Sequence, residues 1–555
     1  MVDKKRRLIL KGAAGATAVG VLGNVSTVNA ALSTATATST SDAEVPTSEE
    51  THRVVIIGSG FGGGIAALRF AEAGVESVVL ERGIRWPTGP NADTFPRASS
   101  IDKRAIWYEA LDKIAANLGS SPTIDQVPGM LNLPAGIKLK KFAGLLEPVF
   151  NKHMAVMCPS GVGGGSLVYQ GMTLQPTKAL FQRVMPAGID YDQMDKVYYP
   201  RVAAMLKVAT APDALINSPT YQVARIFAER VVKAGYSVEK IPMPIDWSFA
   251  LRELKGEMAP AYTNGDAALG VNNGGKHSVD VTYIAQAEQT GLVDLRVLHN
   301  VTQVARGAGG KWQVYVNVTD ESGTLLEKKI FTTNALVMAA GSVNTTKLLL
   351  RAKGKGTIQG LPAALGSGWG TNADRIVTWS RPLSGFGGAV QGGPVIYGSK
   401  EWDNPDTANT IIQASLPPLG KDIKTTMMVG FGVSDKRGTW HYDMGSDDVT
   451  LDWQWEGDFK IHSRILSRMY KIAGFGSILG DTHAIVPSTW HPLGGACMGT
   501  VCDLDGRVRN QPGLYVLDGA LIPGSTAACN PSMTIAAVAE RAMDNIVKHD
   551  IGTLI

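Results

Sequence analysis

The sequence is poor in cysteine. Its 555 residues contain only Cys158, Cys497, Cys502 and Cys529. Domains that depend on a disulfide framework carry far more cysteine than this, so we expect a fold held by its hydrophobic core. Cys497 and Cys502 are close enough in sequence to pair after export, but close spacing alone does not decide whether they do.

Charged residues are also scarce, at 18% of the chain, and the net charge is only +4. Residues 1–30 contain five lysines and arginines and one aspartate, which accounts for the whole of this charge. The rest of the chain is close to neutral, which excludes nucleic-acid binding driven by a basic surface. We expect neither a nucleic-acid partner nor a bound metal.

The sequence has no long apolar run. The weakly apolar stretch that ends near Val25 is too short and too rich in glycine to favour a permanent membrane span. It follows Arg6-Arg7 and precedes Val28-Asn29-Ala30, which resembles a small-residue cleavage site. We therefore expect residues 1–30 to be a twin-arginine signal peptide and residues 31–50 to be a flexible leader. The alternative is a chance basic N-terminus before a disordered tail.

The expected export route bears on the cofactor. The twin-arginine route carries folded proteins, so an enzyme that uses it collects its cofactor in the cytoplasm. A tightly bound flavin suits this better than a free nicotinamide, which would be scarce outside the cell. We expect a secreted or periplasmic flavoprotein.

A dinucleotide-binding pattern begins where the leader ends. The apolar run Val54–Ile57 is typical of a buried parallel strand, and it is followed by Gly58-Ser59-Gly60-Phe61-Gly62-Gly63 and a helical stretch. A second strand, Val78–Leu80, ends at Glu81. Gly58 allows a tight turn, Gly60 lets the backbone approach a pyrophosphate, and Gly63 lets helix and strand pack closely. The order of these parts, with Glu81 placed to bind a ribose, is much more specific than the glycines alone.

Later segments also favour contact with a flat cofactor. The glycine-rich stretch 159–168 is either a flexible loop or backbone packed against a ring, and the apolar residues that follow favour the second. Further strands are expected at 295–302, 312–316 and 335–342, the last ending in small residues near Gly341. A strand over 513–519 ends at Asp518-Gly519. A helix follows Asn530-Pro531, and its N-terminus could stabilise negative charge on a reduced flavin.

The chain changes character between residues 380 and 460. Apolar alternation at 410–415, 427–433 and 449–455 predicts an antiparallel sheet with one apolar face. Tryptophan and methionine on such a face are more often core than ligand contacts. A sheet of this kind beside a dinucleotide domain can nevertheless cover an apolar substrate.

Taken alone, His491 in Trp490-His491-Pro492 is more often a core or surface histidine than a catalyst. The presence of a dinucleotide motif near the other end of the same chain changes that interpretation. If both ends hold one cofactor, Gly58 and His491 belong to one site. We therefore expect His491 and Asn530 to carry chemistry.

These segments together resemble the glucose–methanol–choline (GMC) flavin oxidoreductases, and within them the class I bacterial cholesterol oxidases. The resemblance covers nearly all of residues 52–550. The segments that carry it are Gly58–Gly63, Gly161–Val168, Thr282–Ala287, Leu298–Thr302, Ala339–Val343, Trp369–Asn372, His491–Gly495, Asn530-Pro531 and Ala537–Arg541.

The resemblance implies an α/β (α+β) fold with a Rossmann-like FAD-binding domain and a discontinuous substrate domain on a mainly antiparallel sheet. It implies non-covalent FAD, oxidation of an apolar secondary alcohol such as a sterol, hydride transfer to flavin N5, and O₂ reduced to H₂O₂. His491 would position or deprotonate the alcohol, and Asn530 would tune the flavin. The implied cofactor-binding residues are Gly58, Gly60, Phe61, Gly62, Gly63, Glu81, Gly164, Gly165, Tyr169, Gln170, Met172, Val301, Gly341, Asp518, Gly519, Asn530 and Ser532.

We expect the FAD-binding domain to comprise residues 51–90, 150–175, 280–350 and 480–555. The substrate domain would comprise residues 91–149, 176–279 and 351–479. A sterol substrate would also imply transient contact with a membrane surface to extract it.

The sequence departs from the sterol oxidases at the position of their isomerising glutamate. Aligning Leu416-Pro417-Pro418 with the Pro-rich turn of that family places Gln413 at the position of the acid and Ile411 where an aromatic gate residue is expected. A glutamine cannot accept and return a proton near neutral pH, so we expect oxidation with weak or absent isomerisation. Tyr169-Gln170 also replace a small Asn-Gly pair beside the flavin.

Two other functions remain open at this stage. One is a flavin dehydrogenase of the same superfamily that acts on another bulky apolar alcohol and passes electrons to a quinone or cytochrome. The other is a non-catalytic FAD-binding protein, against which the intact His491 and Asn530 argue.

Overall fold

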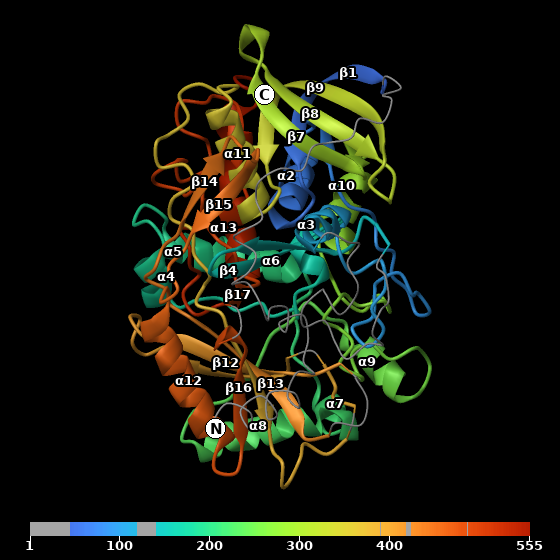
Figure 1. The fold of residues 1–555 in the computed structure, drawn as a ribbon, viewed down its shortest axis with the longest axis vertical. Coiled ribbons are helices and arrows are strands. Elements are labelled where there is room, and N and C mark those ends of the chain that lie inside the picture. The colour runs from blue at the N-terminus through green and yellow to red at the C-terminus, as the bar shows by residue number, and fades with distance from the viewer. Residues whose placement is uncertain (1–44, 119–139, 389, 394, 418–422, 485–486) are drawn as a thin grey trace.

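The computed structural model describes residues 45–118, 140–388, 390–393, 395–417, 423–484 and 487–555. The expected signal peptide and residues 31–44 of the expected leader lie outside these ranges. Figure 1 shows two halves stacked along the long axis, one built around β1 and β9 and the other around β12 and β13.

The first half contains a seven-stranded sheet in the order β6-β2-β1-β9-β8-β7, with β18 also paired with β9. The strands β6, β2, β1, β9 and β18 pair in parallel, whereas β8 and β7 extend the sheet in antiparallel fashion. Val54–Ile57 are buried, as a parallel strand covered on both faces should be. The strands are β1 (Thr47–Ile57), β2 (Ser77–Leu80), β6 (Val293–Arg296), β7 (His299–Arg306), β8 (Trp312–Thr319), β9 (Leu325–Met338) and β18 (Leu514–Val516).

Strand β9 brings distant segments to one edge of this sheet. Its N-terminal part pairs with β8, and its last residues, Leu336–Met338, pair with β18. The carboxyl ends of β1, β9 and β18 therefore meet. Helices α2 (Phe61–Glu72) and α11 (Ser342–Gly354) begin just beyond β1 and β9, and α13 (Ser532–Asp550) follows β18 by sixteen residues. The Rossmann-like prediction is confirmed in this arrangement.

Two local predictions in this half are wrong. The flexible leader was expected to reach residue 50, but β1 already begins at Thr47 and its first residues pair with β9. The single strand expected over 295–302 is two strands. Leu298 adopts a φ of 57°, which breaks the extended chain, so β6 pairs with β2 while β7 turns to pair with β8.

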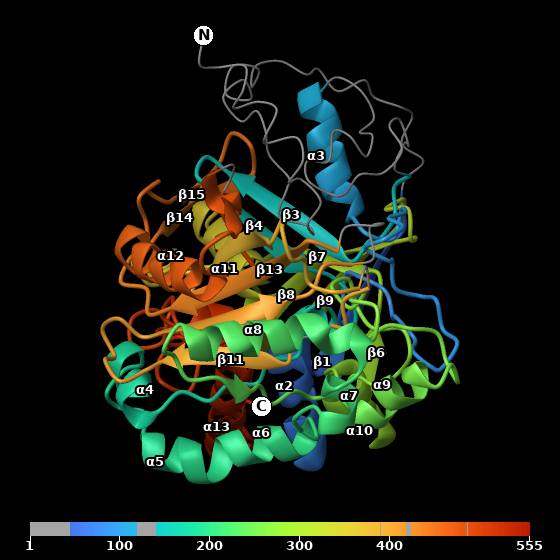
Figure 2. The same cartoon turned by 90° about the horizontal axis from the view of Figure 1, so that it is seen from below.

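The second half contains a six-stranded, fully antiparallel sheet in the order β16-β10-β13-β12-β11-β5. Helices α8 (Gln222–Lys233), close to its predicted position, and α12 (Phe459–Ala473) pack on the sheet face that points away from the first half, which Figure 2 shows in front. The predicted antiparallel sheet is thus confirmed. Its strands are β5 (Glu239–Lys240), β10 (Arg375–Ser380), β11 (Tyr397–Glu401), β12 (Asn409–Ala414), β13 (Thr425–Gly432) and β16 (Ile478–Asp481).

The strand expected over 449–455 does not belong to this sheet. It is β15 (Asp448–Asp452), which forms a separate hairpin with β14 (Thr439–Asp443). The hairpin packs on α11 of the first half. Trp453 is buried edge-on against Trp369, with ring centroids 5.4 Å apart, so this tryptophan belongs to the core.

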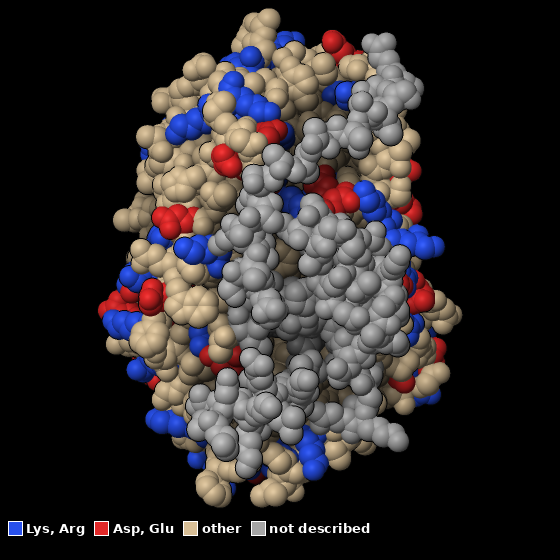
Figure 3. All heavy atoms as spheres, in the orientation of Figure 1, with Lys and Arg blue, Asp and Glu red and all other residues tan. Residues whose placement is uncertain are grey.

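A three-stranded sheet of β3 (Leu146–Asn151), β4 (Met154–Pro159) and β17 (Ser488–Thr489) lies between the halves. None of the helices within the described ranges is long and apolar enough to cross a membrane. All four cysteines are buried free thiols, so the Cys497–Cys502 pairing is absent. Figure 3 shows acidic and basic side chains interspersed on the visible described surface. The other α-helices are α3 (Tyr108–Leu118), α4 (Lys178–Val184), α5 (Tyr191–Gln193), α6 (Tyr199–Met205), α7 (Asp213–Ile216), α9 (Trp247–Leu254) and α10 (Ala285–Gln289).

Candidate active site

A cavity of about 470 Å³ lies between the two halves. The carboxyl ends of β1, β2 and β9 line one part, and one face of β10, β12 and β13 lines another. The predicted site residues on its wall are Gly58, Gly60, Phe61, Gly62, Glu81, Gly164, Gly165, Tyr169, Gln170, Met172, Val301, Gly341, His491, Asp518, Gly519, Asn530 and Ser532. Gly58 and His491 therefore do share one site.

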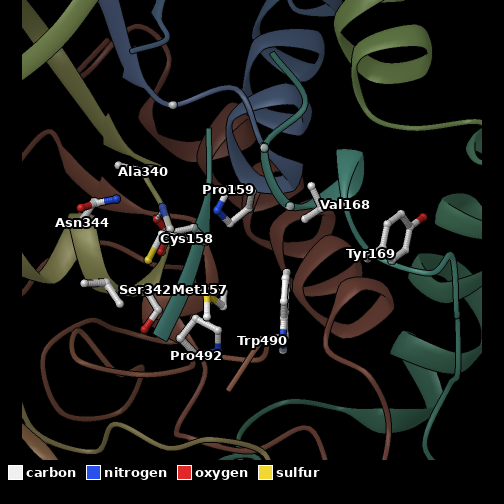
Figure 4. A pocket seen from close by; sticks show the side chains of 18 of the residues that line it. Met157, Cys158, Pro159, Val168, Tyr169, Ala340, Ser342, Asn344, Trp490 and Pro492 are labelled. Carbon is white, nitrogen blue, oxygen red and sulfur yellow. Dashed lines mark hydrogen bonds between the residues drawn. The ribbon is translucent and has the colours of Figure 1, made fainter. Parts of the chain in front are cut away.

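Figure 4 shows how three segments surround part of this cavity. Met157, Cys158 and Pro159 lie on one side, Val168 and Tyr169 lie on the other, and Trp490 stands between them in this view. The wall is therefore assembled from β4, the loop after the second glycine-rich segment and the segment before His491.

The glycines of the first motif have different physical roles. Gly58 has a φ of +94°, and a Cβ there would lie 2.4 Å from the Ala339 carbonyl oxygen. A Cβ on Gly63 would lie 1.9 Å from the Gly58 oxygen, so this residue permits close helix–strand packing, and it lies outside the cavity wall. Gly60 has no atom closer than 3.9 Å to such a Cβ. Its backbone faces open cavity, which suits approach by a ligand.

Three helix N-termini converge on the cavity. Helices α2, α11 and α13 begin after Gly60, Gly341 and Pro531, and none of the three has a side-chain cap or an acidic residue in its first turn. Residues from each first turn line the cavity. Uncapped N–H groups and the positive ends of three helix dipoles form a cradle for an anionic ligand. The chemistry of this wall fits the diphosphate and the reducible ring of FAD.

Glu81 joins the two glycine-rich segments. Its carboxylate accepts hydrogen bonds from Ser59 Oγ (2.7 Å), Gly83 N (2.9 Å), Gly161 N (3.2 Å) and Ser59 N (3.3 Å). Only 6% of the residue is exposed, yet it lines the cavity. Its contact with a ribose stays a prediction, and the loop-joining role was not predicted.

Asp518 connects the end of β18 to α11. Its carboxylate accepts hydrogen bonds from Thr345 Oγ1 (2.5 Å), Gly341 N (2.8 Å) and Ala520 N (2.8 Å). Burial raises the pKa of this carboxyl to about 6, although these three donors favour its charged form. A carboxylate that titrates this close to neutrality lies directly on the cavity wall.

Asn530, Ser532 and Met172 form one network. Asn530 Nδ2 donates to the Met172 carbonyl and to Ser532 Oγ (2.8 Å), and its Oδ1 accepts from Leu174 N (3.2 Å). Ser532 Oγ donates to the same Met172 oxygen at 3.0 Å. The amide is therefore held in one orientation, and only 2% of Asn530 is exposed.

His491 is paired with a carboxylate that the sequence did not reveal. Its Nδ1 lies 2.6 Å from Asp374 Oδ1, and the His491 and Asp374 side chains are 17% and 3% exposed. An ionised carboxylate only accepts hydrogen bonds, so Nδ1 carries the proton. Both residues line the cavity. The two residues are 117 positions apart in sequence, and no spacing rule links them.

Gln413 does not lie on the cavity wall, contrary to the prediction that it occupies the position of a catalytic acid. Its neighbours Ile412 and Ala414 line the cavity, and successive side chains of a strand point to opposite faces. Gln413 Nε2 instead donates to Thr426 Oγ1 (3.1 Å) and Ser415 Oγ (3.2 Å). Ile411 packs with the α12 core on that same outer face, so it cannot act as a gate.

Tyr169 and Gln170, which the sequence predicts to bind the cofactor, both line the cavity. The loop before them is fixed by Lys276, whose Nζ donates to the Tyr169 carbonyl (2.6 Å) and the Leu167 carbonyl (3.0 Å). The same ammonium lies 4.6 Å from the centre of the Tyr169 ring. Burial lowers the pKa of Lys276 to about 7. No sequence signal linked Lys276 to this loop.

The part of the wall near Val301 is charged. Arg82 pairs with Glu147 at 2.5 Å, and Glu109, Lys347 and Arg351 also contribute to the wall. These residues follow no motif, so the sequence does not predict them. No group of three histidine, cysteine or acidic side chains within the described ranges is arranged to hold a metal ion.

Comparisons with known proteins agree with this geometry. The chain matches the models of the GMC oxidoreductase N-terminal part over residues 12–356 and of its C-terminal part over residues 478–539. Cholesterol oxidase of Mycobacterium tuberculosis is 27% identical, with 88% of this chain and 90% of that protein covered. Cholesterol oxidase of Acinetobacter baumannii is 25% identical, with 90% and 95% covered.

Two further proteins are more distantly similar. The 2-methyl-1,2-propanediol dehydrogenase of Mycolicibacterium austroafricanum is 23% identical, with 91% of this chain and 96% of that protein covered. The crystal structure of pyridoxine 4-oxidase from "Mesorbium loti" has a TM-score of 0.60 at 14% identity, covering 90% of this chain and 99% of that one, and supports the fold alone. The chain belongs to the GMC oxidoreductase family and is an FAD-dependent oxidoreductase that acts on CH–OH groups.

Proposed function

We propose that this protein is an exported oxidase that converts a 3β-hydroxysteroid, or a secondary alcohol of similar bulk, to its ketone and passes the electrons to O₂. The observation that carries the substrate class is the apolar cavity wall beside His491. Ile376, Ile412, Ala414, Met427 and Val429 from the antiparallel sheet contribute to it, together with Trp490. Burying a bulky apolar substrate against such a face contributes roughly 25 cal/mol per Å² of apolar area.

Different residues of the cavity wall would bind the cofactor, accept the hydroxyl proton and exclude water. The N-terminus of α2, with Gly60, would hold the diphosphate of FAD, and the α13 N-terminus with Asn530 would face its ring. FAD, when bound, supplies an acceptor for the hydride that leaves the carbinol carbon. His491 Nε2 is the nitrogen that Asp374 leaves available, and it accepts the hydroxyl proton. Trp490 and the apolar sheet face exclude water from the alcohol.

We propose that the ketone is released without a shift of its double bond. Moving a double bond from Δ5 to Δ4 requires a base that takes a proton from carbon and returns it. Strands β12 and β13 contribute no carboxylate to the cavity wall, and the Gln413 side chain faces away from the cavity. Asp374 is already engaged with His491, Thr489 and Trp490.

A substrate screen tests this function. A 3β-hydroxysteroid, a long-chain primary alcohol and a short diol are each supplied under air, with peroxide as the readout and the steroid products separated by chromatography. We expect peroxide with the steroid and mainly the Δ5-3-ketone. Turnover confined to the short diol would contradict the substrate class, and mainly Δ4-3-ketone would contradict the missing isomerase step.

A flavin dehydrogenase that reduces a quinone or cytochrome is the second candidate. The similarity to a diol dehydrogenase over 91% of the chain favours it. The two candidates differ in the acceptor. Rates under air are compared with anaerobic rates in the presence of an artificial quinone, and a dehydrogenase would be fast only with the quinone.

We propose that the twin-arginine signal exports the folded, FAD-loaded protein. Arg6-Arg7 support this, and they lie outside the described residues. The double change Arg6→Lys and Arg7→Lys should keep active protein in the cytoplasm, and secretion at the original level would contradict the route.

We also propose that the far end of the antiparallel sheet contacts a lipid surface when substrate is taken up. Leu383 and Phe475 are almost fully exposed and Ile478 is 58% exposed. Ile478 pairs with Ser380, which lies three residues before Leu383. Ile478 and Leu383 therefore lie near the same end of the sheet. Replacing Leu383 and Phe475 by serine should weaken co-sedimentation with sterol-containing vesicles while activity on detergent-dispersed sterol remains. Unchanged co-sedimentation would contradict this contact.

A further inference from the structure

We infer that Asp374 is a positioning residue that holds His491 in the tautomer needed for alcohol oxidation. The inference rests on the proposed role of His491 as the proton acceptor, but not on which alcohol is oxidised. In the proposed step the hydroxyl proton passes to Nε2 as the carbonyl bond forms, and bound FAD would take the carbinol hydrogen as hydride.

The geometry of the pair determines which ring nitrogen carries the proton. The distance of 2.6 Å between His491 Nδ1 and Asp374 Oδ1 is short for a hydrogen bond, as expected when the acceptor is charged. This bond fixes the proton on Nδ1 and leaves the Nε2 lone pair for the substrate. Without the carboxylate, a neutral imidazole is free to place its proton on Nε2, where it would point at the alcohol instead of receiving a proton.

The Asp374 carboxylate itself cannot rotate freely. Its other oxygen, Oδ2, accepts hydrogen bonds from Thr489 Oγ1 (2.9 Å) and from Trp490 N (3.0 Å). Both donors come from the segment that leads into His491. The His491 backbone N–H in turn donates to Thr489 Oγ1 at 3.0 Å. Asp374 thus fixes both the ring and the chain that carries it.

Among the described side chains around His491, the Asp374 carboxylate is the group that fixes the orientation of the imidazole ring. The edge-on Phe431 ring, 5.8 Å from the His491 ring, offers only an apolar contact. Besides His491, the charged or titratable neighbours of Asp374 include Arg375, Asp458 and His462. Arg375 is engaged with Asp481 and His462, and Asp458 with Ser434 and Thr371.

Substitution by asparagine gives a prediction specific to this arrangement. Two donors face the Oδ2 position, so the amide oxygen of Asp374→Asn is expected to settle there. Its NH₂ group then faces His491 Nδ1, which must accept, and the imidazole proton moves to Nε2. We therefore expect kcat to fall by about 10³- to 10⁴-fold, as when a catalytic imidazole is held in the wrong tautomer.

Asp374→Ala is the matched control. Alanine removes the carboxylate without imposing the wrong tautomer, so it should be more active than Asp374→Asn, and added formate should partly restore its rate. A merely structural role predicts the reverse order, because alanine leaves the larger void.

Three results would each overturn the inference: near wild-type kcat for Asp374→Asn, higher activity for Asp374→Asn than for Asp374→Ala, or no rescue by formate. Should both variants fail to fold, ¹⁵N-histidine NMR of the wild-type holoenzyme decides, with His491→Gln to assign the signal. Protonated Nδ1 in the neutral ring supports the inference, and protonated Nε2 contradicts it. Normal turnover by His491→Gln would instead refute the proposed role of His491 itself.

Discussion

At the scale of single residues, Asn530 is an uncharged side chain that a hydrogen-bond network fixes on the cavity wall. Both amide hydrogens have acceptors, the Met172 carbonyl and Ser532 Oγ. Asn530→Asp keeps the shape but turns a donor into an acceptor that faces the Met172 oxygen. It also adds a negative charge to a site lined by helix N-termini that favour charge on the reduced flavin.

We expect Asn530→Asp to lower the reduction potential of the bound flavin and to slow its reduction by alcohol. Redox titration and anaerobic stopped-flow absorbance measure the two effects. Asn530→Ser, which adds no charge, is the control and should leave the potential closer to that of the wild type. An unchanged potential in the aspartate variant would show that Asn530 does not lie close to the ring.

Asp518 makes the free energy of unfolding depend on pH between about pH 4 and pH 6. Its pKa is raised from 3.8 to about 6 by burial, so the folded state holds a proton that the unfolded state has already lost between these values. The contribution of Asp518 to stability is therefore fully present below about pH 4 and is lost as pH rises through about 6. A shift of this size corresponds to about 3 kcal/mol.

We expect the melting temperature of the wild type, compared with that of Asp518→Asn, to fall as the pH rises from 4 to 6 and to stay level above 6. Thermal unfolding of both proteins across this range measures the difference. A difference that does not vary with pH would mean that Asp518 does not titrate in this window. The asparagine variant should be less stable at every pH, because one amide oxygen cannot serve all three donors that bind Asp518.

At the scale of elements, the alternation of strand β12 decides which of its side chains face the cavity. Gln413→Glu would introduce a carboxylate of the kind that isomerises the steroid in sterol oxidases, but on the face that packs against α12. Its hydroxyl neighbours already donate elsewhere, Thr426 to Gln391 and Ser415 to Gly392. We expect Gln413→Glu to lose stability without producing any Δ4-3-ketone.

Ala414→Glu is the informative partner of that variant, because residue 414 lines the cavity. If the steroid is the substrate, a carboxylate at 414 should raise the Δ4-to-Δ5 ketone ratio, whereas one at 413 should not. Product chromatography measures the ratio. Isomerisation gained by Gln413→Glu would mean that β12 presents the opposite face to the substrate.

Some parts of the site could be predicted from the sequence and others could not, and the difference lies in how far apart in the chain the interacting residues are. Gly58, Gly60 and Glu81 lie in one short segment, where strand, turn and helix impose their spacing. Gln413 was assigned by aligning a Pro-rich turn, and an error of one residue in a strand reverses the face. Asp374 and His491 meet only because β10 and β17 belong to different sheets that converge on the cavity. The break between β6 and β7 falls at Leu298, and leucine is not one of the residue types that mark a turn in a sequence.

At the scale of the whole molecule, the cavity is assembled from both ends of the chain, with Gly58 and Glu81 on one side and His491, Asp518 and Asn530 on the other. A ligand that binds this cavity therefore connects segments that are far apart in sequence. Binding only to the folded state stabilises it by about 2.7 kcal/mol when free ligand is present at 100 times its Kd. FAD should accordingly raise the melting temperature of the apoprotein in a concentration-dependent way.

Two glycine substitutions separate cofactor binding from folding. Gly60 has φ −71° and ψ −161°, an extended backbone conformation that other residues adopt, and a Cβ there would make only an ordinary contact with Gly164 Cα at 3.9 Å. We expect Gly60→Val to leave the melting temperature of the apoprotein unchanged and to abolish the shift produced by FAD. Gly58→Val should instead destabilise the apoprotein itself, because Gly58 has a φ of +94° and its Cβ would collide with the Ala339 carbonyl. Differential scanning fluorimetry with and without FAD measures both effects, and a retained FAD shift in Gly60→Val would place the diphosphate away from the α2 N-terminus.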